Sequence, residues 1–373
     1  MNQHTLPTPP VHKETQFLFD LVSAKSLSGD ESNAAKVFVR GANALGFDTH
    51  IDQVGNAIAH RGDSPQQAVV HIVLLGHIDT VPGDIPVRIE NGILHGRGSV
   101  DAKGPLAAML FAAVRTDLPD GVGLSVVGAV GEETASSIGA RHLVDQWRPD
   151  ACIIGEPSGF DGVTLGYKGR LLANAIATCP NTHSAGKDPS ASDELFAWWT
   201  TVQSKVDTFN IVPTRTFDKI QSCIHHMSSS CDGLNQHAVL NVGFRLPPTM
   251  DPKTLMDILE SQCNTHINVQ FEGAEHASAT TRNDPVVRAI SSAIRSTGNQ
   301  PRPKLKTGTA DLNVVAPIWD CPMAAYGPGD SSLDHTPTEH LNLNEYHQSI
   351  NILDIAIRSL ACELSAANPS ESR

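Results

Sequence analysis

The chain has 373 residues, with 40 acidic residues against 27 Lys and Arg, and its formal net charge is -13. This length can bury a large core and favours two domains. The acidic excess, without a Lys/Arg cluster to neutralise phosphates, argues against nucleic-acid binding and fits a cationic or zwitterionic substrate.

The first part of the chain alternates predicted helices and strands. Apolar periodicity predicts helices at about 15–24 and 32–45, followed by two short strands within 47–59. The apolar run VVHIVLL predicts a buried strand over 69–75, and a hairpin follows at 87–94. Further along, the pattern predicts a helix at 102–114, a strand at 124–130, a helix at 137–146 and a strand at 151–154. Continuous apolar strands between helices indicate an α/β domain with a mostly parallel sheet.

From residue 165 the pattern changes to a β-α-β-β-α-β order. The segment LLANAIATC alternates, KIQSCIHHM, AVLNVGFRL and INVQFEG are strand-like, and helices are predicted at 193–206 and 252–263. This order indicates an α+β ferredoxin-like unit with one open face. The first pattern then returns, with a helix at 286–297, a strand at 321–326 and a last helix at 344–363. We therefore predict a discontinuous catalytic domain (1–164 and 275–373) with an inserted domain (165–274).

Several side chains that can bind metal ions follow the predicted strands of the first domain. They are His77, Asp79, Glu132, Glu133, Glu156 and His335, and Asp101 lies in a glycine-bracketed turn. Because ligands bind at the carboxyl ends of strands in open α/β sheets, these side chains could converge. Carboxylates and imidazoles meeting there would suit one or two Zn²⁺ ions. Asp101 could bridge two metal ions about 3.5–4 Å apart.

Each of these residues also has a simpler interpretation when taken alone. His77 could be a loop-end histidine bonded to backbone, and Asp79 and Asp101 could be turn residues that cap helices. The Glu132–Glu133 pair could be an acidic helix N-terminus, and His335 a surface residue. The metal interpretation depends on all of them lying on one edge of one sheet.

The sequence also resembles a known family. In order, it contains GHIDTVPG, GRGSVDAKGPLAA, GEE, GEPS and GPGDSSLDHTPTEH, which resemble the signature segments of M20 metallopeptidases. That group includes acetylornithine deacetylase, succinyl-diaminopimelate desuccinylase, aminoacylase, glutamate carboxypeptidase and carrier-protein lysine hydrolase. The resemblance covers nearly the whole chain and implies a zinc-exopeptidase-like domain with an inserted lid and dimerisation domain. The segments GEPSGFDGVTLGYKG and KTGTADLNVVAP are most similar to the deacetylase and carrier-protein lysine hydrolase branch.

The resemblance implies a set of metal ligands. His77 and Glu156 would hold one ion, Glu133 and His335 the other, and Asp101 would bridge them. The implied cofactors are two divalent ions, Zn²⁺ or alternatively Co²⁺.

The resemblance also implies roles for residues around the metal ions. Asp79 would bond the far ring nitrogen of His77 and fix its tautomer, and Glu132 would be the general base. In the inserted domain, His183 would reach an active site, in many relatives that of the partner subunit. Arg245 would grip a substrate carboxylate. From the residues themselves, Asp311 could meet a cationic amine of the substrate or be a packed turn aspartate.

We therefore predict a metal-dependent hydrolase that cleaves the amide bond of an N-acyl amino acid, of the acetylornithine or acetyl-lysine deacetylase type. A dipeptidase or carboxypeptidase is the alternative enzyme, with a short peptide as substrate. A ligand-binding dimer without activity would be expected to lack a ligand or the base, and none is missing. A serine hydrolase would need a G-x-S-x-G elbow, which the segment around Ser99 does not form.

The remaining expectations concern assembly and location. The resemblance implies a homodimer formed through the inserted domain. The N-terminal residues lack the pattern of a signal peptide, the tail ANPSESR carries no recognisable targeting signal, and no apolar run could span a membrane. Seven scattered cysteines without a CxxC pair favour reduced thiols. We therefore expect a cytoplasmic protein that has no membrane or nucleic-acid partner.

Overall fold

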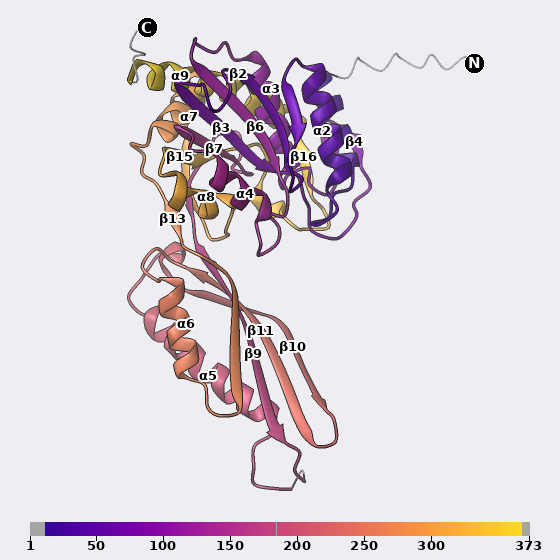
Figure 1. Ribbon diagram of the computed structural model, residues 1–373, viewed down its shortest axis with the longest axis vertical. Helices are drawn as coiled ribbons and strands as arrows, with labels where there is room; N and C mark the ends of the chain where they lie inside the picture. The colour runs from indigo at the N-terminus through magenta and orange to yellow at the C-terminus, as the bar shows by residue number, and fades with distance from the viewer. Residues whose placement is uncertain (1–11, 184, 368–373) are drawn as a thin grey trace, which may run out of the picture. The chain divides into compact units, whose positions relative to one another are not determined.

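The computed structural model describes residues 12–183 and 185–367 and divides the chain into two units (Figure 1). Unit 1 comprises the chain up to Thr164 together with 281–304 and 318–373, and unit 2 comprises 165–280 and 305–317. The signal-peptide and targeting predictions made from the two ends of the chain concern mainly residues 1–11 and 368–373, which lie outside the described residues.

The segment 305–317 lies in unit 2, although the sequence pattern placed it in the catalytic domain. The reason is a set of hydrogen bonds to backbone carbonyls of unit 2. Asn313 Nδ2 donates to the carbonyl oxygens of His276, at 2.7 Å, and Lys168, at 3.1 Å. Thr309 Oγ1 donates to the same Lys168 carbonyl at 3.2 Å.

The sheet of unit 1 has a parallel centre and antiparallel edges. In spatial order its strands are β1 (Asp48–Ile51), β2 (Ala57–Gly62), β6 (Val122–Ala129), β3 (Val70–His77), β7 (Ala151–Gly155), β15 (Met323–Ala325) and β8 (Gly162–Tyr167). The short strands β13 (Ser278–Ala279) and β14 (Arg302–Lys306) also pair with β8. The neighbours β6, β3, β7 and β15 run parallel. Every residue of β3 and β6 is buried, as expected for strands covered on both faces. The predicted α/β domain with a mostly parallel sheet is confirmed.

Helices pack around this sheet. They are α1 (Lys13–Ser23), α2 (Ser32–Ala44), α3 (Lys103–Arg115), α4 (Ile138–Gln146), α7 (Pro285–Ser296) and α9 (Leu343–Ala367), and α8 (Asp311–Trp319) crosses from unit 2 into unit 1. The helix α3 packs against β3 and β6 and also against α1 and α9. A Cβ atom at Gly76 or Gly128 would lie 3.3 or 3.0 Å from Leu106 of α3. Glycine at both positions therefore lets α3 approach the strands closely.

A small second sheet joins two loops of unit 1. Its strands are β16 (His340–Asn342), β5 (Ile93–His95) and β4 (Arg88–Glu90), with a short 3-10 helix at Ser331–Leu333 before it. The pair β4 and β5 is the predicted hairpin. Because β16 pairs with β5, the loop before β16 lies beside the turn after β5.

Unit 2 contains an antiparallel sheet with two helices. The strands, in spatial order, are β10 (Gln221–Cys231), β11 (Asn235–Leu246), β9 (Gly169–Pro180) and β12 (Ile267–Glu275). The helices are α5 (Ala191–Phe209) and α6 (Pro252–Ser261), and a short 3-10 helix lies at Thr216–Asp218. Figure 1 shows α5 and α6 on the same face of this sheet. The predicted β-α-β-β-α-β order is present.

The two faces of the unit 2 sheet differ in burial. Alternate residues of β9 are buried, and they join a core with Leu195 and Trp198 of α5 and Leu255 of α6.

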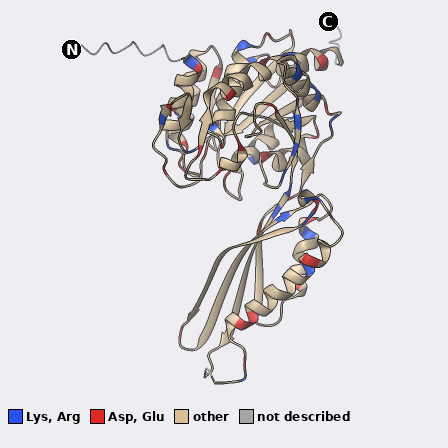
Figure 2. Ribbon diagram, turned by 180° about the vertical axis from the view of Figure 1, so that it is seen from behind, with Lys and Arg blue, Asp and Glu red and all other residues tan. Residues whose placement is uncertain are grey.

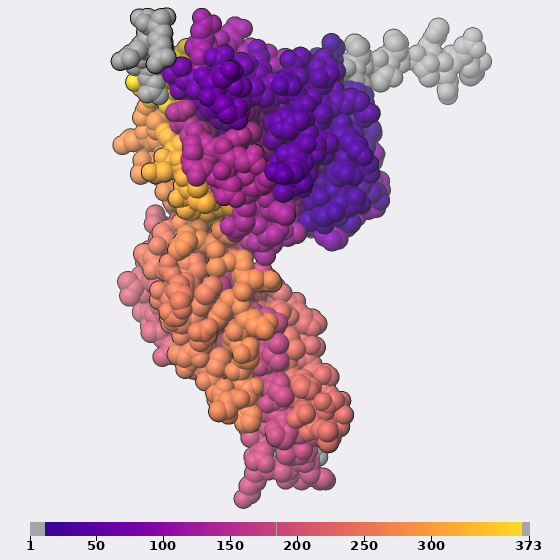
Figure 3. Space-filling view, in the orientation of Figure 1, coloured from indigo at the N-terminus to yellow at the C-terminus, as the bar shows by residue number. Residues whose placement is uncertain are grey.

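The long strands of unit 2 carry few charged residues, whereas its helices carry several (Figure 2). In the space-filling view, the orange residues of α6 and β12 lie side by side on the visible surface of the unit (Figure 3).

Two further observations concern sequence-based expectations. The seven cysteines are all free thiols. Within residues 12–183 and 185–367, the structure has no helix with the length and apolar character that crossing a bilayer requires.

Candidate metal centre

Parallel strands bring the sequence-predicted ligands of unit 1 to one edge of the sheet. His77 is the last residue of β3, Glu133 follows β6 by four residues, and Glu156 directly follows β7. Since β6, β3 and β7 are parallel neighbours, their carboxyl ends lie together. His335 comes from the loop before β16, and Asp101 stands two residues before α3.

His77, Asp101 and Glu156 form one group of candidate ligands, with one ligand atom of each within 4.8 Å of the others. His77 Nε2 lies 3.1 Å from Asp101 Oδ1 and 3.9 Å from Glu156 Oε1. The His77 side chain is 1% exposed, and Glu156 is also buried.

Asp101, Glu133 and His335 form a second group. His335 Nε2 lies 3.2 Å from Asp101 Oδ2 and 3.0 Å from Glu133 Oε2. Asp101 therefore turns one carboxylate oxygen to each group, as a bridging ligand would. His335 has a φ of +62°, in the left-handed region that few non-glycine residues adopt. Such strain is typical of functional positions.

Asp79 lies beside the ring nitrogen of His77 that does not face Asp101, and it also holds a neighbouring turn. His77 Nδ1 donates to the backbone carbonyl of Asp79 at 3.1 Å, and the Asp79 carboxylate lies farther away, at 3.5 Å. The His77 ring therefore contacts Asp79 through Nδ1, while Nε2 faces the Asp101 carboxylate. The Asp79 carboxylate also accepts from the backbone N–H groups of Glu132 and Glu133, both at 3.1 Å. It fixes the turn that holds these two glutamates.

Ser28 completes this arrangement and was missed in the sequence. Its Oγ donates to Asp79 Oδ2 at 2.7 Å. In the sequence, Ser28 belongs to a Ser-Gly-Asp-Glu segment that reads only as a turn, and the separation of 51 residues from Asp79 gives no local signal.

The electrostatics of the edge follow from its crowded carboxylates. Burial opposes a charged His77, but hydrogen bonds with Asp101 and Asp79 outweigh it and raise the pKa of His77 well above its usual value. Hydrogen bonds with Asp101 and Glu133 raise the pKa of His335 to about 10. Burial raises the pKa of Glu133, whereas His335 and His77 overcome burial and lower the pKa of Asp101. The edge thus attracts positive charge.

The donor set fits a pair of divalent metal ions. The two groups supply three carboxylates and two imidazoles, with Asp101 common to both. Mixed histidine and carboxylate ligands are typical of catalytic zinc sites. A shared carboxylate can bridge two ions about 3.5–4 Å apart.

The remaining sequence-predicted residues lie in unit 2. His183 is exposed in the loop after β9, where its Nδ1 accepts from the backbone N–H of Ala185. Asp311 is buried at the first residue of α8. Arg245 of β11 donates to Thr309 Oγ1 at 2.6 Å. It lines a pocket of about 220 Å³ with Arg170, its cross-strand partner on β9.

The chain is similar in sequence to proteins of one known family. The profile of peptidase family M20/M25/M40 matches residues 73–359. The chain is 43% identical to a [LysW]-lysine hydrolase of Deinococcus radiodurans, over 95% of this chain and 99% of the relative. It is 40% identical to a putative [LysW]-lysine/[LysW]-ornithine hydrolase of Thermococcus kodakarensis, over 93% of this chain and 92% of the relative.

Solved structures share the fold. An M20 family metallo-carboxypeptidase from Sulfolobus solfataricus superposes with a TM-score of 0.77 at 17% identity, covering 94% of this chain and all of that one. The aminopeptidase PepT of Bacillus cereus superposes with a TM-score of 0.72 at 19% identity, covering 94% of this chain and 98% of that one.

Proposed function

The chain belongs to peptidase family M20/M25/M40, and we propose that the edge described above is the two-metal centre of an N-acyl amino acid hydrolase. It is a hydrolase of amide bonds, as its family and relatives are. The observation that carries the two-metal proposal is Asp101, which presents one carboxylate oxygen to His77 and the other to His335.

In this proposal, His77 and Glu156 hold one ion, Glu133 and His335 hold the other, and Asp101 bridges them. Such ions, when bound, polarise a carbonyl oxygen and lower the pKa of water. We propose zinc as the physiological ion, because imidazole and carboxylate ligands suit it.

Glu132 is the proposed general base. Glu132 is adjacent to the proposed ligand Glu133, and Asp79 holds the backbone of both residues. The backbone position from which the Glu132 side chain extends is therefore fixed beside the centre. Glu132 would accept a proton from the attacking water and deliver it to the leaving amine.

We propose a LysW-linked lysine or ornithine as the substrate, after the names of the two relatives. Arg245, with its planar fork of donors, would bind a substrate carboxylate, and the neighbouring Arg170 adds positive charge to the same pocket. Asp311 is the proposed partner of a substrate amine. His183 is proposed to reach an active site when the protein is assembled. A free N-acetyl amino acid or a dipeptide is the alternative substrate.

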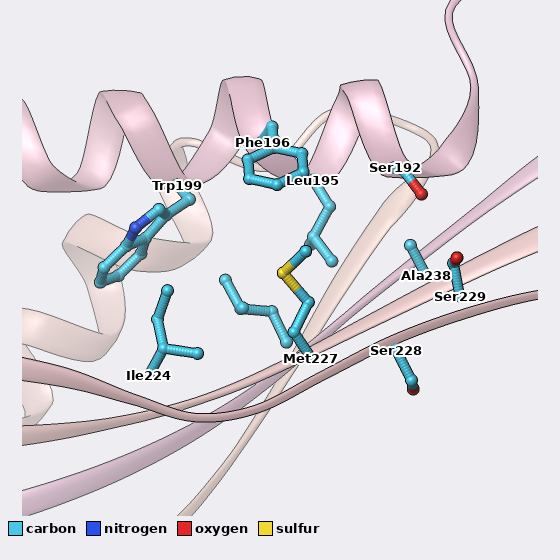
Figure 4. A pocket seen from close by; sticks show the side chains of 10 residues that line it. Ser192, Leu195, Phe196, Trp199, Ile224, Met227, Ser228, Ser229 and Ala238 are labelled. Atoms are coloured by element: carbon cyan, nitrogen blue, oxygen red, sulfur yellow. The ribbon is translucent and has the colours of Figure 1, made fainter.

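A homodimer formed through unit 2 is the proposed assembly, and we propose the cytoplasm as its location. A groove between α5 and β10 is lined by exposed apolar side chains, among them Phe196 at 52%, Ile224 at 42% and Met227 at 51% exposed (Figure 4). The strand β10 is an edge of its sheet and has no Asp, Glu, Lys or Arg along QSCIHHMSSSC. Uncharged edge strands are ready to pair with a second chain.

The dimer proposal has a direct test. Met227→Glu places a charge in the groove, so sedimentation velocity should show a shift from dimer to monomer. Replacing Lys253 by Gln, on the exposed surface of α6, changes the net charge by the same −1 and serves as the charge control. A wild-type monomer, or a Met227→Glu protein that stays dimeric, would contradict the proposed interface.

The proposed function is tested by measuring amine release. The purified protein, loaded with Zn²⁺ or Co²⁺ or stripped by a chelator, is given LysW-linked lysine, N-acetyl-lysine, N-acetylornithine and dipeptides. We expect metal-dependent release that is fastest for the LysW-linked amino acid. Faster cleavage of dipeptides would favour the peptidase alternative, and two bound metal equivalents without any hydrolysis would favour a binding protein.

A further inference from the structure

We infer that Glu339 is a positioning residue of the metal centre, whose carboxylate fastens the Asp101 turn to the loop that carries His335. The inference rests on the proposed two-metal centre and assigns a role to a residue outside its ligand set.

The carboxylate of Glu339 accepts hydrogen bonds from one turn. Its side chain is fully buried. Oε1 accepts from the backbone N–H of Val100 at 2.9 Å and of Asp101 at 3.1 Å. Oε2 accepts from Arg97 Nη1 at 2.7 Å. One carboxylate thus holds three donors of the segment 97–101.

The position of Glu339 in the chain gives this hold its consequence. Glu339 is four residues after His335, in the same loop, and directly precedes β16. The loop that supplies one metal ligand therefore also anchors the backbone of the shared ligand Asp101. The 3.2 Å separation of His335 Nε2 from Asp101 Oδ2 depends on the two loops staying together.

The two ligand groups should depend on this anchor to different degrees. His77 and Glu156 are placed by the ends of β3 and β7, which the parallel sheet fixes. His335 has no strand directly before it and reaches Asp101 from a loop. Losing the anchor should therefore weaken the Asp101–Glu133–His335 position more than the His77–Asp101–Glu156 position.

Arg97 makes the anchor an ion pair. A buried carboxylate is stable only when it is paired and hydrogen-bonded, and Arg97 supplies the pair. Arg97 Nε also donates to the carbonyl of Gly83 at 3.1 Å, which ties the guanidinium to a further loop. In Glu339→Gln, an amide nitrogen would face either Arg97 or the two backbone N–H groups, donor against donor.

The test compares Glu339→Gln with a matched carboxylate elsewhere in unit 1. Asp284 also ties two segments together, because it bonds Met323, the first residue of β15. This end of β15 is opposite the carboxyl end, where the metal edge lies. Its carboxylate accepts from the backbone N–H groups of Val286 at 2.8 Å, Val287 at 3.3 Å and Met323 at 3.2 Å. Asp284→Asn therefore reports what losing a structural carboxylate does by itself.

The measurement is a titration of each metal-stripped protein with Zn²⁺ against a chromophoric chelator, which gives a dissociation constant for each equivalent. Thermal unfolding of the same samples reports stability. For Glu339→Gln we expect one equivalent, assigned to the Asp101–Glu133–His335 position, to lose about 10–100-fold in affinity, as expected when a residue that orients ligands is changed. The other equivalent should change less, and raised Zn²⁺ should recover kcat/KM. Asp284→Asn should lose stability while keeping both constants.

Several results would overturn the inference. Unchanged zinc constants in Glu339→Gln would do so, and so would an equal loss of affinity in Asp284→Asn. If Glu339→Gln does not fold, Arg97→Gln removes the ion pair but keeps the two backbone bonds, and wild-type zinc constants in that variant would count against the inference. A wild-type protein that binds fewer than two zinc equivalents would instead refute the proposed centre.

Discussion

Replacing Asp79 by Asn should unsettle both Glu132 and Glu133 at once. The Asp79 side chain is fully buried, and its two oxygens accept from three donors in addition to facing His77 Nδ1 at 3.5 Å. Oδ2 accepts from Ser28 Oγ and from the backbone N–H of Glu133, and Oδ1 accepts from the backbone N–H of Glu132. An Asn side chain has only one acceptor oxygen. When that oxygen takes the place of Oδ2, it keeps the bonds from Ser28 and Glu133, and the bond from Glu132 is lost.

The size of the effect follows from these contacts. Hydrogen bonds to a charged group contribute about 1.5–3 kcal/mol each, and an unsatisfied buried donor costs about 1–3 kcal/mol. Asp79→Asn loses one such bond, leaves the N–H of Glu132 facing an amide N–H, and weakens the other two bonds. We expect the free energy of unfolding to fall by about 2–4 kcal/mol. Zinc affinity should fall about 10–100-fold, since the Glu133 turn loosens.

The assay is urea denaturation together with the zinc titration, applied to Ser28→Ala and Asp79→Ala as well. Ser28→Ala removes one donor and leaves both backbone bonds, so its effect should be the smallest of the three. Asp79→Ala removes every acceptor, so its effect should be the largest. If Asp79→Ala and Ser28→Ala have equal stability and wild-type zinc affinity, the carboxylate does not hold the Glu132–Glu133 turn.

Three further predictions concern protons. Glu132→Gln should lower kcat by about 10²–10⁴-fold with unchanged zinc content by elemental analysis, and wild-type turnover would exclude Glu132 as the base. Zinc binding to the metal-stripped protein near pH 7.5 should release protons from His77 and His335, because their pKa values are raised. This release should diminish as the pH rises through about 10. Calorimetry in buffers of different ionisation enthalpy measures the release, and finding none would contradict the prediction. Burial lowers the pKa of His71 from 6.5 to about 4. As the pH falls, His71 therefore takes up a proton in the unfolded chain before it does so in the folded protein. The free energy of unfolding should decline by about 3 kcal/mol between pH 6.5 and 4. Urea denaturation should show a shallower decline in His71→Gln, and equal slopes in both proteins would refute this assignment.

Much of the fold could be predicted because its signals are local. The buried run at 69–75 and the alternation in LLANAIATC are periodicities within single elements, and they correspond to β3 and β9. Four of the candidate ligands stood out because they follow predicted strands, and parallel strands end at the same edge, whereas Asp101 stood out in a glycine-bracketed turn. The signature segments in GHIDTVPG and GPGDSSLDHTPTEH added roles by resemblance.

The sequence by itself therefore determined the α/β and α+β organisation and the residues to examine. The tertiary structure decided which atoms meet. It showed that His77 bonds the backbone of Asp79, that Ser28 and Glu339 brace the ligand turns, and that 305–317 packs with unit 2. The physical reason is separation along the chain. Glu339 and Asp101 are 238 residues apart, and a hydrogen bond across that separation leaves no periodic pattern in the sequence.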